Sequence, residues 1–290
     1  MPHLKLGVPK GSLEAATVDL FRQAGWTIAS RSRNYFPSID DPDISCALVR
    51  SQEMGPYIES GTLDVGLTGM DWILETKADV QVVTDLVYSK ASDQPSRWVL
   101  VVDRDSPIQS VQDLEGKVIA TELVDFTKRY LAERGVTATV QFSWGATEAK
   151  VVEGMADAAV EITETGSTIK AHGLRIVCDL LHTHTVLVAN KAALADPWKK
   201  KKIDQIALLL TAALAARGKV LLKMNVSAAD RDAVVALVPS LHAPTINRLA
   251  DGDWYAVETV VDRARVRDLI PDLRAAGAEG ILELDLQKIC

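Results

Sequence analysis

Short apolar runs typical of buried strands alternate with helix-like segments along most of this 290-residue chain. The first unit is representative, because the strand-like run LKLGVP precedes a segment whose apolar positions recur every three or four residues. The positions on that one helical face are Leu13, Ala16, Thr17, Leu20 and Phe21. Strands that alternate with helices favour a largely parallel sheet, so we expect an α/β fold.

The pattern changes near residue 190. The segment DPWKKKKIDQIALLLTAALAARGK has Pro197 in its opening turn and an apolar stripe ending at Leu214, which predicts a long amphipathic helix with four solvated lysines. The residues after it follow the order strand, helix, strand, strand, helix, strand, if APTINRL is a strand. This split βαβ order predicts a ferredoxin-like or ACT-like domain that begins around Lys219.

Composition narrows the class of function. Hydrophobic residues make up 48% of the chain, and a net charge of -7 arises from interleaved acids and bases. We therefore expect no nucleic-acid face, so a phosphate ligand would have to be held locally. Three widely spaced cysteines fit neither a disulfide framework nor a zinc site. With no visible signal peptide or membrane-spanning run, a cytoplasmic protein without membrane contact is expected.

One strand end carries an unusual density of small donors. The strand-like run GMADAAV leads into EITETGSTIKAHG, where Glu161 is followed by hydroxyl side chains around Gly166. Backbone amides and hydroxyls at a helix start bind phosphate, and an acid can accept hydrogen bonds from ribose hydroxyls. The loop is therefore a candidate site for a 5-phosphoribosyl group. Because Thr and Ser also cap ordinary helices, a well-capped turn remains the alternative.

Other polar residues follow three more strand-like runs. Lys10, Gly11 and Ser12 come after the first strand, while Arg50 and Asp71 stand at the ends of two others. Open α/β sheets bind ligands at the carboxyl ends of their strands, so these residues could line one cleft. Their alternative interpretation is an ordinary helix cap and separate surface charges.

The histidines favour structural roles. His182 and His184 alternate in LLHTHTVLVAN and would share one face of a strand, but no third metal ligand is near them in the sequence. His172 stands beside the hydroxyl-rich loop, where it could touch a ligand or satisfy carbonyls at a helix end. We expect hydrogen bonding rather than metal binding.

Several stretches together resemble the ATP phosphoribosyltransferase family, the first enzyme of histidine biosynthesis. They are LKLGVPKGSL, GTLDVGLTGMDWI, GMADAAVEITETGSTIKAHGLRIV and the tail from LHAPTINRLADGDW to ILELDLQKI. The resemblance covers essentially the whole chain, and the tail is similar to the regulatory domain of the long form. It implies a two-lobed, periplasmic-binding-protein-like catalytic region over residues 1–218, with a second lobe, about 95–183, inserted in the first. Residues 219–290 would form the ACT-like regulatory domain.

The resemblance also implies an activity and its residues. The family transfers the phosphoribosyl group of phosphoribosyl pyrophosphate (PRPP) to N1 of ATP, with inversion, and needs Mg²⁺; no metal cage from the protein alone is evident. The resemblance assigns PRPP to Glu161, Thr163, Thr165, Gly166, Ser167 and Thr168, and ATP to Lys10, Gly11, Arg50 and Asp71. The family often has aspartate in place of Glu161. No nucleophile or general base is identified, and Glu122 stays outside the firm assignment because its neighbours depart from the family pattern.

Regulation is implied for the tail. In the long form, histidine binds the ACT-like domain and inhibits, and the matching positions here are Asn225, Leu241, Thr245 and Gly280. Family members assemble as dimers and hexamers, so a homo-oligomer is expected, and assembly would connect the tail with the active site. These four residues could equally be ordinary core and turn positions of a small domain.

Two other functions remain open from the sequence. Another PRPP-dependent phosphoribosyltransferase would use a similar loop, because a phosphate site does not specify the acceptor. A non-catalytic small-molecule binding module would share the two lobes, but would not need the hydroxyl-rich loop.

Overall fold

The protein is described here by a computed structural model that places residues 2–29, 35–88, 94–240, 243–250 and 252–290. It forms two compact units, Met1–Ala207 and Leu208–Cys290. The division lies inside the helix α8 (Pro197–Ala216) rather than at Lys219, where the sequence predicted it. The second half of α8 belongs to the second unit because the C-terminal tail bonds to it, with Ile289 N–H donating to the Ala212 carbonyl at 2.9 Å.

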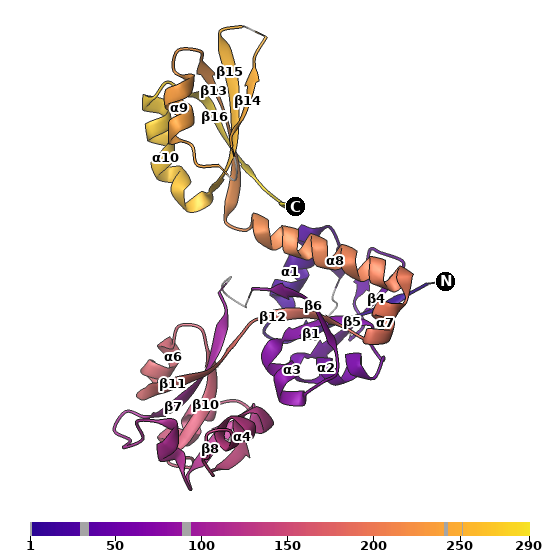
Figure 1. Cartoon of the computed structure of the whole chain (residues 1–290), viewed down its shortest axis with the longest axis vertical. Helices are drawn as coiled ribbons and strands as arrows, with labels where there is room; N and C mark the ends of the chain where they lie inside the picture. Colours follow the sequence, from indigo (N-terminus) through magenta and orange to yellow (C-terminus); the bar gives the residue numbers. More distant parts are fainter. Residues whose placement is uncertain (1, 30–34, 89–93, 241–242, 251) are drawn as a thin grey trace. The chain divides into compact units, whose positions relative to one another are not determined.

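The first sheet of the first unit has the strand order β4-β1-β5-β12-β6. The strand β1 (Leu4–Lys10) is parallel to β4 (Ile44–Arg50) and β5 (Val65–Gly69), whereas β12 (Thr185–Ala189) is antiparallel to β5 and to β6 (Gln81–Leu86). Each parallel strand leads into a helix: α1 (Glu14–Ala24), α2 (Ser51–Glu59) and α3 (Met70–Thr76). The predicted α/β fold is confirmed, and the carboxyl ends of these strands lie at one edge of the sheet (Figure 1).

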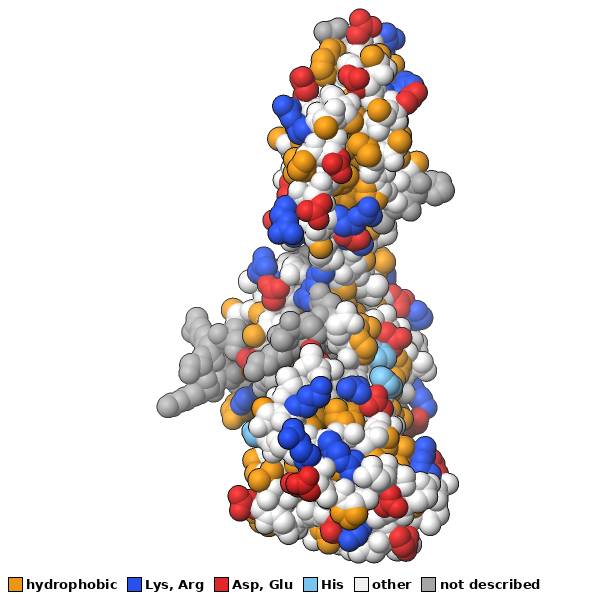
Figure 2. Space-filling model, turned by 90° about the vertical axis from the view of Figure 1, so that its left-hand side faces the viewer, with side chains coloured by type: hydrophobic (Ala, Val, Ile, Leu, Met, Phe, Trp, Pro, Cys, Tyr) orange, Lys and Arg blue, Asp and Glu red, His pale blue; other side chains and the backbone are white. Residues whose placement is uncertain are grey.

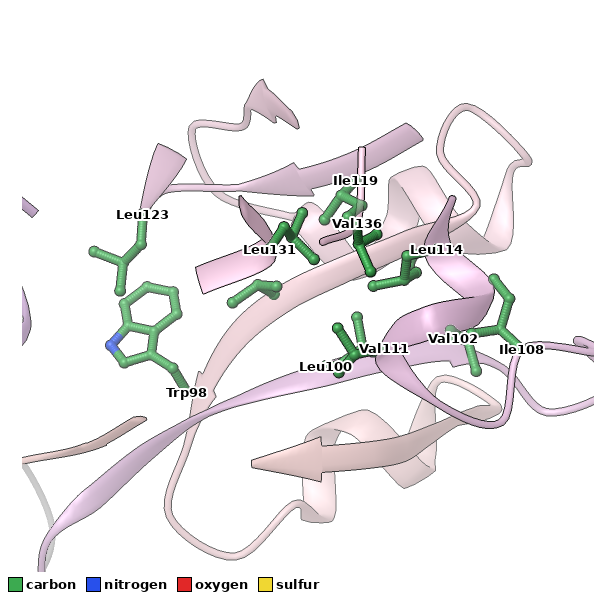
Figure 3. Close-up of a cluster of buried hydrophobic side chains, with 12 residues drawn as sticks. Trp98, Leu100, Val102, Ile108, Val111, Leu114, Ile119, Leu123, Leu131 and Val136 are labelled. Carbon is green, nitrogen blue, oxygen red and sulfur yellow. The ribbon is translucent and has the colours of Figure 1, made fainter. Parts of the chain in front are cut away.

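The second sheet has the order β11-β7-β10-β8-β9. Its strands are β11 (Leu174–Thr183), β7 (Ser96–Asp103), β10 (Ala158–Thr163), β8 (Val118–Thr121) and β9 (Thr139–Phe142), of which β10, β8 and β9 run parallel. Its helical elements are η1 (Val111–Leu114), α4 (Val124–Ala132), α5 (Thr147–Val152) and α6 (Ser167–Ala171). Figure 3 shows its apolar core, which runs from Trp98 and Leu123 at one end to Ile108 at the other.

The second sheet is inserted between β6 and β12 of the first, from Ser96 to Thr183. The chain returns to the first sheet through His184, which separates β11 from β12. The prediction that His182 and His184 share one strand face is therefore wrong, because the strand ends between them. The remaining short elements of the unit are the paired strands β2 (Ile28–Ala29) and β3 (Ser38–Ile39), and helix α7 (Lys191–Ala195).

The second unit contains a four-stranded antiparallel sheet of order β14-β15-β13-β16. Its strands are β13 (Lys219–Ser227), β14 (Thr245–Arg248), β15 (Trp254–Asp262) and β16 (Glu279–Asp285). Helices α9 (Arg231–Leu237) and α10 (Arg263–Ala275) cover one face of the sheet, where alternate residues of β13 are fully buried (Figure 1). This arrangement is the ferredoxin-like domain that the order of elements predicted.

The surface mixes charges of both signs. Lys, Arg, Asp and Glu side chains are scattered over the face of each unit shown in Figure 2. Among the helices that the structure describes, none has the length and apolarity needed to cross a membrane.

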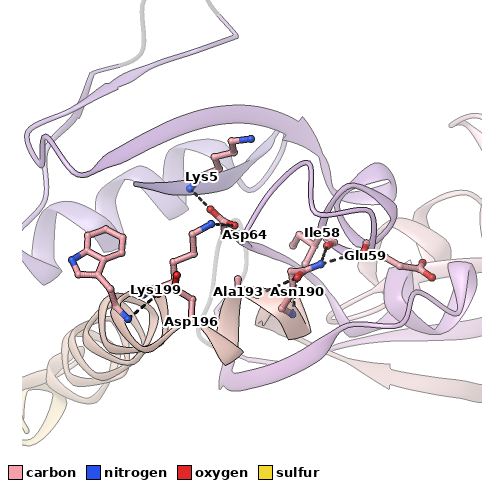
Figure 4. Close-up of polar contacts among 10 residues, drawn as sticks. Lys5, Ile58, Glu59, Asp64, Asn190, Ala193, Asp196 and Lys199 are labelled. Carbon is pink, nitrogen blue, oxygen red and sulfur yellow. Dashed lines mark hydrogen bonds and ion pairs between the residues drawn. The ribbon is translucent and has the colours of Figure 1, made fainter. Parts of the chain in front are cut away.

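Two of the four lysines in the first turn of α8, Lys200 and Lys201, are exposed as predicted, but Lys199 and Lys202 form ion pairs with acids of the first unit. Lys199 Nζ lies 2.7 Å from Asp64 Oδ1, and Lys202 Nζ lies 2.6 Å from an oxygen of Asp41. The other oxygen of Asp64 accepts the Lys5 N–H of β1 at 2.9 Å (Figure 4). Asp64 is only 6% exposed, so this carboxylate joins β1, the start of β5 and α8 in one buried contact.

The substitution Asp64→Ala should lower the free energy of unfolding by about 3 kcal/mol, because it leaves Lys199 and the Lys5 N–H without their acceptor. The control is Asp204→Ala, which removes an exposed pair with Lys200 and should cost less than about 1 kcal/mol. Urea unfolding of both variants measures the difference. Equal losses would show that the Asp64 contact is no stronger than a surface pair.

Candidate functional site

A cavity of about 750 Å³ lies within the first unit and is lined by both of its sheets. The first sheet contributes residues at the carboxyl ends of β1, β4 and β5, and the second contributes residues of β7, β10 and α6 together with Glu122, which follows β8. Residues 183–185, where the chain returns to the first sheet, line it as well. Of the residues assigned from the sequence, those in its wall are Lys10, Gly11, Arg50, Asp71, Thr163, Thr165, Ser167 and Thr168. Glu161 and Gly166 are not among the residues that line it.

The two cations of the first sheet rest on aromatic rings. Lys10 Nζ lies 3.8 Å from the ring centre of Tyr35, and the Arg50 guanidinium lies 5.4 Å from that of Trp144. A ring contact orients a cation without neutralising it, so both charges remain available to phosphate. Trp144 follows β9, so the Arg50 contact joins the two sheets. No periodic pattern marked either ring in the sequence.

Asp71 is a buried residue, not a surface charge. Its side chain is 2% exposed, and its Oδ2 accepts a hydrogen bond of 2.7 Å from Trp98 Nε1 of the second sheet. Its own N–H donates to Thr183 Oγ1 at 3.1 Å. Burial raises the pKa of Asp71, although these donors act in the opposite direction. Trp98 carries no local signal in the sequence, because its partner Asp71 is distant along the chain.

The hydroxyl-rich loop combines an internal bond with open donors. The Gly166 N–H donates to Thr163 Oγ1 at 2.8 Å, so part of the loop does form a capped turn. Ser167 and Thr168 are exposed in the cavity wall. Gly166 has a left-handed φ of 76°, and an added Cβ would lie 3.1 Å from Ile176 Cδ1. A side chain there would strain the loop itself, so hydroxyl variants are the better probes of a ligand.

Carboxylates lie close to the cavity. Burial raises the pKa of Glu161 to about 7, while a hydrogen bond from Thr147 lowers it and nearby Glu148 and Glu122 raise it. Glu122 itself lines the cavity, and its pKa is raised by burial and by Asp71 against a hydrogen bond from Gln52. The site therefore places acids beside the cations of the first sheet, and includes the glutamate left outside the firm assignment.

Each histidine near the site contacts a different acid. His184 lies 2.8 Å from Asp85, while His182 lies 3.5 Å from Asp179. His172 lies 3.6 Å from Glu148, an acid next to the Thr147 that bonds Glu161. Across the described ranges, no group of three His, Cys, Asp or Glu side chains could hold a metal ion.

The raised pKa of Glu161 predicts a pH-dependent effect on stability. Because glutamate ionises near 4.5 in the unfolded chain and near 7 here, the folded protein loses stability as pH rises through this interval. Glu161→Gln removes the free-energy cost of ionising this buried carboxyl group. It should therefore stabilise the protein by about 2 kcal/mol more at about pH 8.5 than at about pH 5. Thermal and urea unfolding at both pH values measure this, with the exposed Glu153→Gln as control. The same pH dependence in both variants would contradict a buried, destabilised carboxylate.

Two family models match the chain. The model described as ATP phosphoribosyltransferase matches residues 50–212, and the one described as HisG, C-terminal domain, matches residues 216–288. The first match contains most of the cavity wall, and the second contains the four-stranded sheet of the second unit.

Named relatives match over nearly the full length. An ATP phosphoribosyltransferase of Desulfosudis oleivorans is 60% identical over 286 residues, covering 99% of this chain and 98% of the relative. One from Nitratidesulfovibrio vulgaris is 61% identical with the same coverage. A solved chain of the ATP phosphoribosyl transferase (HisG:HisZ) complex from Thermotoga maritima matches with TM-score 0.62 and 26% identity, covering 72% of this chain and 98% of that one. These matches show that the protein belongs to the ATP phosphoribosyltransferase family.

Proposed function

We propose that the protein transfers the phosphoribosyl group of PRPP to N1 of ATP in this cavity, giving N1-(5-phospho-β-D-ribosyl)-ATP and pyrophosphate in the first step of L-histidine biosynthesis. The observation that carries the proposal is the composition of the cavity wall. It brings the hydroxyl loop of the second sheet into the same space as Lys10 and Arg50 of the first. Two phosphate-bearing substrates require two such groups of donors.

PRPP is assigned to the second sheet. Ser167 and Thr168 would donate to the 5-phosphate from their exposed positions, with Thr163 and Thr165 bracing the loop. From β10, at the base of the hydroxyl-rich loop, Glu161 would accept hydrogen bonds from the ribose hydroxyls. Positive charge that develops on the anomeric carbon would favour its ionised form.

ATP is assigned to the first sheet. Lys10 and Arg50 would leave their aromatic rings for phosphate oxygens, and Gly11 allows close approach at its φ of 109°. Asp71 is also assigned to ATP, and Trp98 holds its carboxylate in the cavity wall.

The reaction needs little covalent help from the protein. The adenine N1 lone pair forms a bond to the anomeric carbon on the face opposite pyrophosphate, and the carbon–oxygen bond to pyrophosphate breaks with inversion. The protein has to position the two substrates and to stabilise an oxocarbenium-like transition state. Glu161 and Glu122 supply negative charge near that carbon, while the cations face the phosphates.

Magnesium is proposed as part of the bound substrate. It would neutralise charge that develops on the departing pyrophosphate, and substrate phosphates commonly provide most of its ligands.

The purified protein should form product from ATP, PRPP and Mg²⁺, measured by the absorbance of N1-substituted adenine with inorganic pyrophosphatase present.

Thr168→Val should raise KM for PRPP about tenfold and change KM for ATP less than about twofold, because one charge-assisted hydrogen bond is lost. The isosteric control is Thr139→Val on exposed β9. No product from the native protein would refute the activity, and equal changes in both KM values would refute the division of substrates.

We further propose that histidine binds the second unit and inhibits a homo-oligomer in the cytoplasm. Asn225 and Gly280 are adjacent in this unit, since a Cβ added at Gly280 would lie 3.8 Å from Asn225 Nδ2. Thr245 is on β14, separated from β13 by β15, and Leu241 lies outside the described residues. The three free cysteines suit a reducing compartment, and the named HisG:HisZ relative is itself a complex.

Asn225→Ala should raise the histidine concentration for half-inhibition at least about tenfold while kcat stays unchanged, because one hydrogen bond from the half-buried Asn225 amide to the bound histidine is lost and Asn225 is not a residue of the cavity wall. Lys219→Ala, at the other end of β13, is the control and should keep normal inhibition. Initial rates against histidine concentration measure the effect. Unchanged inhibition in Asn225→Ala would remove this residue from the site.

A further inference from the structure

Helix α4 of the second sheet is capped by the first sheet. Its own N-cap residue is Leu123, whose side chain cannot accept a hydrogen bond. Instead the Glu75 carboxylate of α3 accepts the Asp125 N–H at 2.9 Å and the Phe126 N–H at 2.7 Å. Both amides belong to the first turn of α4, where backbone donors have no partner within the helix. A carboxylate at this position also complements the helix dipole.

The contact is reciprocal. Arg129 of α4 donates from Nη2 to the Leu74 carbonyl in the last turn of α3. Carbonyls in a last turn lack partners within their helix, and a cation is the favourable charge there. Each helix therefore satisfies the free end of the other with a side chain of the matching charge. We call Glu75 and Arg129, with the backbone groups they bind, the helix-end clamp.

The clamp adjoins the cavity at both helices. Asp71, in the first turn of α3, is held by Trp98, and Glu122 immediately precedes Leu123 and α4. Trp98 and Leu123 lie together at one end of the second sheet's core (Figure 3). The short helix α3 thus contacts the second sheet at its first turn through Asp71 and at its last turn through the clamp. Two separated contacts fix an angle as well as a distance.

An ordinary helix cap would not account for this arrangement. Capping side chains normally come from the N-cap residue or from three residues after it. Here 50 and 51 residues separate Glu75 from the amides it binds, and 55 separate Leu74 from Arg129. The bonds join parts of the chain that carry different substrates under the proposed function.

We propose that Glu75 is a positioning residue for phosphoribosyl transfer, which sets the spacing of the two sheets across the cavity through the helix-end clamp and thereby places Glu122 and Asp71. The inference rests on the proposed function for its kinetic part. Glu75 touches neither substrate; it aligns the groups that do. Misalignment of two bound substrates reduces the rate of the chemical step more than it weakens either one's binding.

The test compares Glu75→Ala, Glu75→Gln, Arg129→Met and the double variant Glu75→Ala/Arg129→Met in the full-length protein. Glu75→Ala should lower kcat about tenfold with each KM within about threefold of native. Glu75→Gln should be intermediate, because its amide oxygen can accept from only one of the two amides. The double variant should be no slower than about the worse single variant, since the two residues act as one unit. Glu59→Ala, an exposed glutamate in the last turn of α2, is the matched control.

Hydrogen exchange tests the helix-end clamp independently of enzyme activity. The amides of Asp125 and Phe126 should exchange at least about tenfold faster in Glu75→Ala than in the Glu59→Ala control. Unchanged exchange would overturn the clamp, even in an active enzyme. A kcat within twofold of the control, or losses that add in the double variant, would overturn the positioning role. A native protein that forms no product would refute the proposed function instead, while the exchange result would still decide the clamp.

Discussion

The buried residue Asp71 connects the first sheet to both strands that lead to and from the second, through its carboxylate to Trp98 and through its backbone N–H to Thr183. Trp98 lies on the outgoing strand β7, and Thr183 ends the returning strand β11. A carboxylate with 2% exposure is stable only when donors surround it, so these bonds constrain where the strands cross. Where these strands connect the two sheets, the carboxyl ends of parallel strands from both sheets face one cavity.

The cations of the cavity wall come from the first sheet, while acids come from both sheets. Lys10 and Arg50 come from the first sheet and rest on exposed rings of Tyr35 and Trp144. Glu122 and Glu161 come from the second, where burial raises the pKa of each. Cations positioned for phosphates and carboxylates near a developing cationic carbon would stabilise the transition state without a dedicated base.

The sequence predicted features whose signals are local. Strand-like apolar runs that alternate with helix-like segments predicted the α/β sheets. The order of elements near the C-terminus predicted the ferredoxin-like domain. The hydroxyl loop and Lys10 were located because they directly follow strands. Contacts between distant residues were not predictable in this way: 27 residues separate Asp71 from Trp98, and 135 separate Asp64 from Lys199. The lysines of α8 are an example: Lys200 and Lys201 are exposed as predicted, but the distant carboxylate partners of Lys199 and Lys202 could not be identified from the run of four charges.

If each sheet holds one substrate, hydrogen exchange with single ligands should show PRPP and ATP protecting different segments of the chain. PRPP with Mg²⁺ alone should protect residues 163–168, with little change in residues 10–12 and 50–52. ATP alone should protect the latter two segments and leave the hydroxyl loop unchanged. Protection of the same segments by both ligands would contradict the division of the cavity between the two sheets.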